Sequence, residues 1–111
     1  LNKVENYVKI FEGDVRKVIK NNFHQKFDRI IMNLPSKAYE FLDVASKVVK
    51  SNGVIHYYQF VPESEYPTEF LEDLRNYFEK YGRKIGKILS KRKVRAYAPY
   101  IWQIGIDILI Q

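Results

Sequence analysis

Apolar residues recur along the chain at two spacings, and these predict strands and helices in turn. Tyr7–Phe11 is a short β-prone run, and Val15–Asn22 has apolar residues at helix-like intervals. Phe27–Met32 becomes almost continuously apolar after Arg29, which is typical of a strand covered on both faces. The first third of the chain is therefore predicted to fold as strand, helix, strand.

The next segment has a regular helical pattern and a second strand. Ser36 is a candidate helix cap. The apolar residues after it keep to one helical face and are Ala38, Phe41, Leu42, Ala45, Val48 and Val49. Asn52-Gly53 predicts a left-handed helix end. Val54–Val61 then reads as another buried strand, which Pro62 ends.

The second half of the chain predicts a helix and then a hairpin. An amphipathic helix is expected to begin at Thr68, a plausible cap, and to end at Gly82. Its apolar positions are Phe70, Leu71, Leu74, Tyr77, Phe78 and Tyr81. Ile85–Tyr97 and the alternating Trp102–Ile110 are predicted strands, joined by a short turn at Ala98–Tyr100. Two strands joined in this way form an antiparallel hairpin.

The order of these elements predicts the fold class. Strands alternating with helices indicate an α/β fold with a mostly parallel, Rossmann-like sheet. The terminal hairpin adds an antiparallel strand to that sheet. With 111 residues, the whole chain 1–111 is expected to form one domain.

Composition removes several classes of protein. No apolar run approaches the roughly 20 residues that a membrane-spanning helix needs, so no membrane partner is expected. The absence of Cys excludes disulfides, thiolate metal sites and a Cys nucleophile, and fits a reducing, cytoplasmic location. His24 and His56 lack metal-ligand spacing, so both are interpreted as structural and no metal site is predicted.

The net charge of +6 is concentrated in one stretch. The segment 83–95 holds seven basic residues and no acid, while the rest of the chain holds 12 basic and 13 acidic residues. The seven are Arg83, Lys84, Lys87, Lys91, Arg92, Lys93 and Arg95. Such a patch suits a polyanion such as RNA. The same charges would also serve to keep an exposed strand edge from aggregating.

The apolar strand at 27–32 runs directly into Asn33-Leu34-Pro35, and a helical pattern follows at once. The tripeptide therefore lies in a strand-to-helix turn, at the end of the strand where open α/β sheets bind ligands. A plain strand-exit turn would have the same pattern.

Three groups of residues are informative when taken together: Asn33-Leu34-Pro35 with Ala38 and Phe41-Leu42, the upstream Gly13-Asp14-Val15-Arg16, and the late Val94-Arg95-Ala96-Tyr97-Ala98-Pro99. In this order they resemble a known family, the archaeal and eukaryotic tRNA guanine-N1-methyltransferases. These enzymes methylate the purine just 3′ of the anticodon, and their close relatives build wybutosine there. The resemblance covers the whole chain. It implies the C-terminal half of a class I methyltransferase domain, with S-adenosylmethionine as cofactor and tRNA as substrate.

The resemblance also implies roles for residues near the first two strands. Asp14, beside Val15, matches the acidic position that accepts a hydrogen bond from the adenine amino group; an ordinary helix-start Asp is the alternative. Asn33, with Leu34, would hold the methionine end of the cofactor and the edge of the target guanine. Pro35 would fix the backbone of that catalytic turn.

The late motif would lie near the mouth of the pocket. There Tyr97 would stack on a flipped base, and the basic residues Lys91, Arg92, Lys93 and Arg95 would meet phosphate. Tyr97 as an ordinary core or rim residue is the alternative.

The family's glycine-rich cofactor turn, its ribose-binding acid and its proposed general base have no counterpart in the chain. We therefore expect 1–111 alone to be inactive and to bind S-adenosylmethionine weakly. Two further strands of the family sheet would separate Tyr7–Phe11 from 27–33 by roughly 14 Å. The first strand would then pair with a second copy, with the absent N-terminal half, or directly with its neighbour. A dimer or swapped assembly is the expectation.

Other functions stay open at this point. A wybutosine-pathway transferase fits the same motifs, and a class I enzyme acting on an exocyclic amine is disfavoured because Tyr39 lies too far beyond Pro35. A non-catalytic basic RNA-binding module would explain the charge but leave Asn33 and Asp14 without purpose. One of Glu63, Glu65 and Glu69 could act as a general base, but the simpler interpretation is that all three belong to a solvated loop.

Overall fold

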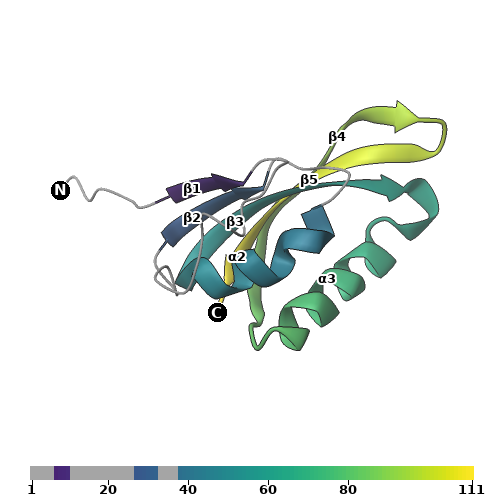
Figure 1. The fold of residues 1–111 in the computed structure, drawn as a ribbon. Helices are drawn as coiled ribbons and strands as arrows, with labels where there is room; N and C mark the ends of the chain where they lie inside the picture. The colour runs from purple at the N-terminus through teal and green to yellow at the C-terminus, as the bar shows by residue number, and fades with distance from the viewer. Residues whose placement is uncertain (1–6, 11–26, 33–37) are drawn as a thin grey trace.

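The computed structural model describes residues 7–10, 27–32 and 38–111. In chain order its elements are β1 (Tyr7–Ile10), β2 (Phe27–Met32), the 3-10 helix η2 (Ala38–Phe41), α2 (Leu42–Val48), β3 (Val49–Pro62), the 3-10 turn η3 (Glu63–Glu65), α3 (Thr68–Lys80), β4 (Ile85–Ala98) and β5 (Ile101–Ile110). Figure 1 shows α2 and α3 lying on the same face of one sheet. Within the described ranges, neither helix has the length and hydropathy that crossing a bilayer requires.

The sheet confirms the predicted class. Its strand order is β1-β2-β3-β5-β4. β1, β2 and β3 pair in parallel, whereas β5 runs antiparallel to both β3 and β4. The fold is therefore a Rossmann-like α/β sheet in which only the last strand is reversed.

β1 pairs directly with β2, in the register Tyr7↔Arg29 to Ile10↔Met32. The expected gap of two strands between these segments is therefore wrong for this chain, and the third of the three alternative pairings is confirmed. The physical reason is that an open edge of β2 carries backbone N–H and C=O groups that need partners. Association with a second copy or with another half stays a prediction.

The apolar core lies between the helices and one face of the sheet. Its fully buried members include Ile30, Met32, Ile55, Tyr57, Leu42, Leu74, Phe78 and the four alternating isoleucines of β5, Ile104, Ile106, Ile108 and Ile110. Arg29, Ile31 and His56 on the opposite face are only partly buried. The expectation that β2 and β3 are covered on both faces is therefore wrong for the described part of the chain, where helices cover one face.

The helix predicted from Ser36 begins as the 3-10 turn η2 and becomes α-helical only at Leu42, without a side-chain cap. Ser36 itself lies outside the described residues. The chain enters β3 directly at Val49, and the left-handed residue is Asn52, with φ of 67°. Gly53 has a different role, because a Cβ there would lie 2.6 Å from Val49 Cγ2 and 2.8 Å from the Lys50 carbonyl oxygen. Asn52 therefore adopts the left-handed conformation, and Gly53 allows the backbone to pass close to Val49 and the Lys50 carbonyl.

Arg83 caps the end of α2. Its Nη1 donates to the carbonyl oxygens of Ser46, at 2.5 Å, and Val49, at 2.8 Å. A cation at a helix C-terminus satisfies orphan carbonyls and complements the helix dipole. The side chain is 8% exposed, and burial lowers its pKa. Arg83 is therefore a structural residue, and its inclusion in the basic patch is corrected.

We predict that Arg83→Ala lowers the free energy of unfolding by about 2–3 kcal/mol, because two charge-assisted hydrogen bonds to the end of α2 are lost. Urea denaturation followed by circular dichroism measures the change. Lys84→Ala is the control, since the adjacent Lys84 side chain is exposed. Equal stability of the two variants would contradict the capping role.

Gly53→Ala should destabilise the protein by about 1–3 kcal/mol, since the added methyl group overlaps Val49 and two backbone carbonyls. Gly86→Ala is the matched control, because a Cβ at Gly86 meets nothing closer than 3.4 Å. Thermal unfolding of both variants compares the two sites. A Gly53→Ala protein as stable as the control would argue against the close approach.

Candidate nucleic-acid interface

The β4–β5 hairpin ends in a two-residue turn, Pro99–Tyr100, between the paired residues Ala98 and Ile101. Figure 1 shows this end of the hairpin rising clear of the two helices. Proline fixes a negative φ, and Tyr100 has φ of 62°, the sign combination of a type II turn. Glycine usually occupies the second position, so a tyrosine there costs about 1–2 kcal/mol. The turn presents an aromatic ring at a conformational cost.

Two tyrosine rings are exposed at the end of the hairpin. Tyr97 is 61% exposed and stacks on Phe60 of β3, with ring centroids 3.9 Å apart and an interplanar angle of 21°. Tyr100 is 79% exposed. Both rings line an open hollow of about 340 Å³ that Trp102 and Glu63 also border. Tyr97 is thus outside the core, and the hollow offers flat aromatic walls to a planar group.

Lys93 lies on the helix side of the sheet. Its Nζ is 4.9 Å from the centre of the Trp102 ring and 5.9 Å from that of Tyr66. It also forms an ion pair with Glu63 at 3.8 Å. The Lys93 ammonium is therefore partly neutralised and held beside aromatic rings.

Arg92 lies on the opposite face, over β5 and β3. Its Nη1 donates to Ser90 Oγ at 2.9 Å, its Nη2 donates to Tyr58 Oη at 3.3 Å, and Nη1 is 3.6 Å from the Asp107 carboxylate. Gly105 makes room for this packing, because a Cβ there would lie 3.0 Å from Tyr58 Cε1 and 3.3 Å from Arg92 Cζ. Arg92 is thereby anchored to the sheet.

Among the four basic residues predicted to bind RNA, Arg95 and Lys91 have the fewest described contacts within the protein. Arg95 uses its Nε to donate to Gln103 Oε1 at 2.9 Å, which leaves its Nη atoms without a described partner. Lys91 is exposed and has no described ion pair or hydrogen bond. These two side chains fit a phosphate-binding role better than Arg92 and Lys93 do.

The five predicted RNA-binding residues share β4 but divide between two faces. Lys91 and Lys93 alternate onto the helix side, while Arg92, Arg95 and Tyr97 contact side chains of the other face. A register shift between Lys93 and Arg95 brings Arg95 to the same face as Arg92. The structure therefore places Arg95 and Tyr97 on the same face of β4.

His56 belongs to a polar chain that links three strands on the face away from the helices. Arg29 Nη1 donates to its Nε2 at 3.1 Å, and its Nδ1 donates to Asp107 Oδ1 at 2.7 Å. These contacts fix the ring tautomer and tie β2, β3 and β5 together. In the described segments no three His, Cys, Asp or Glu side chains gather as metal ligands would.

The residues predicted to hold the cofactor and to catalyse, Asp14, Val15, Asn33, Leu34 and Pro35, lie outside the described residues, and so does His24. The strands that precede them are described. Because Ile10 and Met32 are register partners in parallel strands, the chain leaves β1 and β2 at the same edge of the sheet. In open α/β folds this is the ligand-binding edge.

Comparison with known proteins identifies relatives of this fold. The family model for the TRM5/TYW2 methyltransferase domain matches residues 1–86. The tRNA (guanine(37)-N(1))-methyltransferase Trm5b of Pyrococcus abyssi is 46% identical over 107 residues, which are 96% of this chain and 30% of that protein. The tRNA(Phe) (4-demethylwyosine(37)-C(7)) aminocarboxypropyltransferase of Pyrococcus horikoshii is 32% identical, over 99% of this chain and 38% of that protein.

Solved structures agree with the sequence comparison. The crystal structure of Methanocaldococcus jannaschii TYW2 in complex with AdoMet superposes with a TM-score of 0.74 and 34% identity, over 80% of this chain and 40% of that one. Pyrococcus abyssi Trm5b gives a TM-score of 0.69 and 45% identity, over 78% and 26%. The chain spans less than half the length of these relatives. It belongs to the TRM5/TYW2 methyltransferase domain family.

Proposed function

We propose that the chain is part of an S-adenosylmethionine-dependent tRNA methyltransferase that transfers a methyl group to N1 of guanine 37, just 3′ of the anticodon. The single observation that carries the proposal is its 46% identity to a Trm5b enzyme over 96% of its length. A structure of aTrm5 with tRNALeu, 37% identical at a TM-score of 0.60, supports tRNA as the substrate.

The residues present fit the cofactor chemically. β1 and β2 end at one edge, and the chain that follows them carries the Asp14 carboxylate and the Asn33 amide. We propose that Asp14 accepts from an amino group of the adenine, beside Val15, and that Asn33 and Leu34 hold the methionine end. The cofactor supplies an electrophilic methyl group on sulfur.

Asn33 would position the target base through the two functions of its amide. The amide N–H donates and its C=O accepts, so one side chain can fix the guanine edge for in-line attack. Pro35 restricts the backbone of this turn and keeps the amide in place. Such positioning lowers the barrier by making the reacting atoms neighbours before reaction.

The hairpin would contribute to binding the tRNA. A base that reacts must leave its stack, and Tyr97 and Tyr100 offer exposed rings on which an unstacked base can rest. Arg95 and Lys91 would contact phosphate nearby, whereas Arg92 and Lys93, already paired within the protein, would add mainly long-range attraction.

A second candidate is aminocarboxypropyl transfer in the wybutosine pathway. It is favoured by the TM-score of 0.74 to M. jannaschii TYW2 and by the 32% identity to the P. horikoshii transferase. Mass spectrometry of the product nucleoside distinguishes the two reactions, because one adds a methyl group and the other an aminocarboxypropyl group.

In a protein that carries this domain with its cofactor-binding half, Asn33→Ala should lower methyl transfer to tRNA about 100-fold, because the target base loses its alignment. The assay measures transfer of radiolabelled methyl to unmodified tRNA. Asn76→Ala, an exposed position on α3, is the control and should leave the rate unchanged. Normal turnover by the Asn33→Ala protein would refute its catalytic role.

Tyr97→Leu combined with Tyr100→Gly should weaken tRNA binding about 10- to 100-fold through loss of two stacking platforms. The glycine should at the same time stabilise the turn by about 1 kcal/mol, since φ at position 100 is positive. Filter binding and thermal unfolding measure the two effects. Tyr81→Leu, which changes an exposed tyrosine that follows α3 and is not part of the hairpin, is the control, and equal affinity of both variants would remove the hairpin from the interface.

A further inference from the structure

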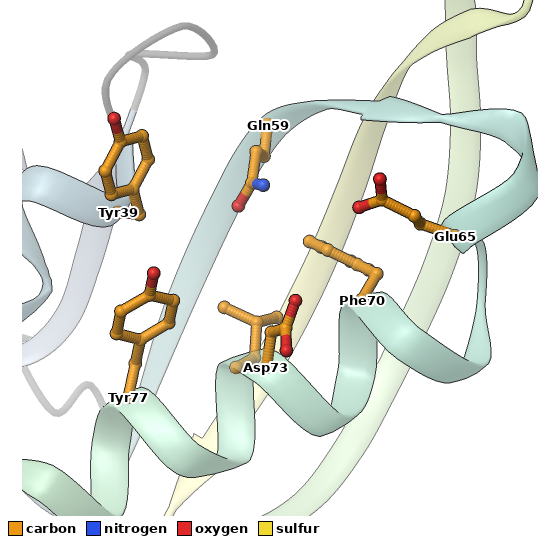
Figure 2. Close-up of a pocket in the computed structure, with 7 residues that line it drawn as sticks. Tyr39, Gln59, Glu65, Phe70, Asp73 and Tyr77 are labelled. Carbon is orange, nitrogen blue, oxygen red and sulfur yellow. The ribbon is translucent and has the colours of Figure 1, made fainter.

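A cavity of about 190 Å³ lies on the helix side of the sheet. Its walls come from η2, the end of β3, η3 and α3. The lining residues are Tyr39, Gln59, Glu65, Phe70, Asp73, Leu74 and Tyr77. Figure 2 shows these side chains arranged around one common space. A cavity of about 150 Å³ already holds benzene, so this one has room for a small organic group.

Aromatic rings form the walls. Tyr39 and Tyr77 face each other with centroids 6.4 Å apart and an interplanar angle of 30°. They are 45% and 37% exposed, so they form the mouth of the cavity. Phe70 of α3 is buried and forms an inner wall. The negative faces of such rings attract a cation, and most strongly one that lacks a tight water shell.

The two charged side chains of the described lining are both negative. Glu65 and Asp73 each carry a carboxylate, and no Lys or Arg from the described part of the chain is among the lining residues. Neither carboxylate forms an ion pair or hydrogen bond within the described part of the chain. In a chain of net charge +6, this is a hollow with two unneutralised negative groups. Such a lining repels anions and attracts cations.

The floor of the cavity is fixed by a buried tyrosine. Tyr57 Oη donates to Gln59 Oε1 at 2.6 Å. Burial, with smaller contributions from Tyr77 and Tyr39, raises the pKa of Tyr57, so its hydroxyl stays protonated and keeps donating. The carbonyl oxygen of Gln59 is thereby held in one orientation, and its second lone pair can accept from a ligand.

We propose that this cavity binds an alkylammonium group, with the ammonium beside Glu65 and Asp73 and the alkyl chain against the rings of Tyr39 and Tyr77. The rings and Leu74 suit a hydrocarbon body, and the carboxylates and Gln59 Oε1 suit N–H donors. A free polyamine and a lysine side chain present the same chemistry. Binding of such a group is tested with neither cofactor nor tRNA present.

Titration followed by NMR of the tyrosine rings tests the site. Spermidine, n-butylammonium and Nα-acetyl-lysine amide should each shift the Tyr39 and Tyr77 signals saturably, and n-butanol, which has a similar body without charge, should not. Spermidine binding more tightly than the two single ammonium compounds identifies a polyamine site. Equal affinities identify a site for a lysine side chain.

Paired variants make the test specific. Glu65→Gln with Asp73→Asn should weaken n-butylammonium binding at least about tenfold. Glu69→Gln with Glu72→Gln removes the same charge from exposed positions of α3 outside the cavity and should change affinity less than about twofold. Circular dichroism checks that both double variants fold. Equal weakening by the two pairs, shifts with n-butanol, or no saturation below ~100 mM would overturn the proposal.

Discussion

The alternation of side chains along β3 is the constraint on which the rest of the molecule depends. β3 pairs with β2 on one side and β5 on the other, and successive residues must point to opposite faces. Tyr57 and Gln59 therefore support the cavity under the helices, while Tyr58 and Phe60 carry Arg92 and Tyr97 on the other face. A shift of one residue in register would exchange the two surfaces.

The elements themselves could be predicted from periodicity, because burial of one face sets both the 3.6-residue pattern of α3 and the alternation of β5. A turn at Ala98–Tyr100 could also be predicted from Pro99, and the structure narrows it to Pro99–Tyr100 because Ala98 still pairs with Ile101. Contacts between distant residues carry no local signal. Arg83 caps α2 by binding the carbonyl oxygens of Val49 and Ser46, which lie 34 and 37 positions earlier in the chain. In the sequence alone, Arg83 is only the first of the seven basic residues in the segment 83–95.

The same limit applies to the sites. Motifs could nominate Asn33 and Tyr97, since each belongs to a contiguous signature, but the cavity combines residues of α3 with one residue from each of three other elements. The prediction from charge also assigned all the basic residues of β4 to a single surface. Packing instead leaves Lys91 and the Nη atoms of Arg95 available and pairs Arg92 and Lys93 internally. Net charge therefore overstated how much of the strand can contact phosphate.

The backbone at Pro99–Tyr100 has a consequence for the thermodynamics of association. A pyrrolidine ring and a left-handed tyrosine leave the loop few alternative conformations, whereas a glycine in the second position would sample many. Because the backbone at Tyr100 is already restricted, less conformational entropy would be lost if a base stacked on its ring as proposed. The unfavourable dihedral angle is thus a form of preorganisation, set during folding instead of at the moment of contact.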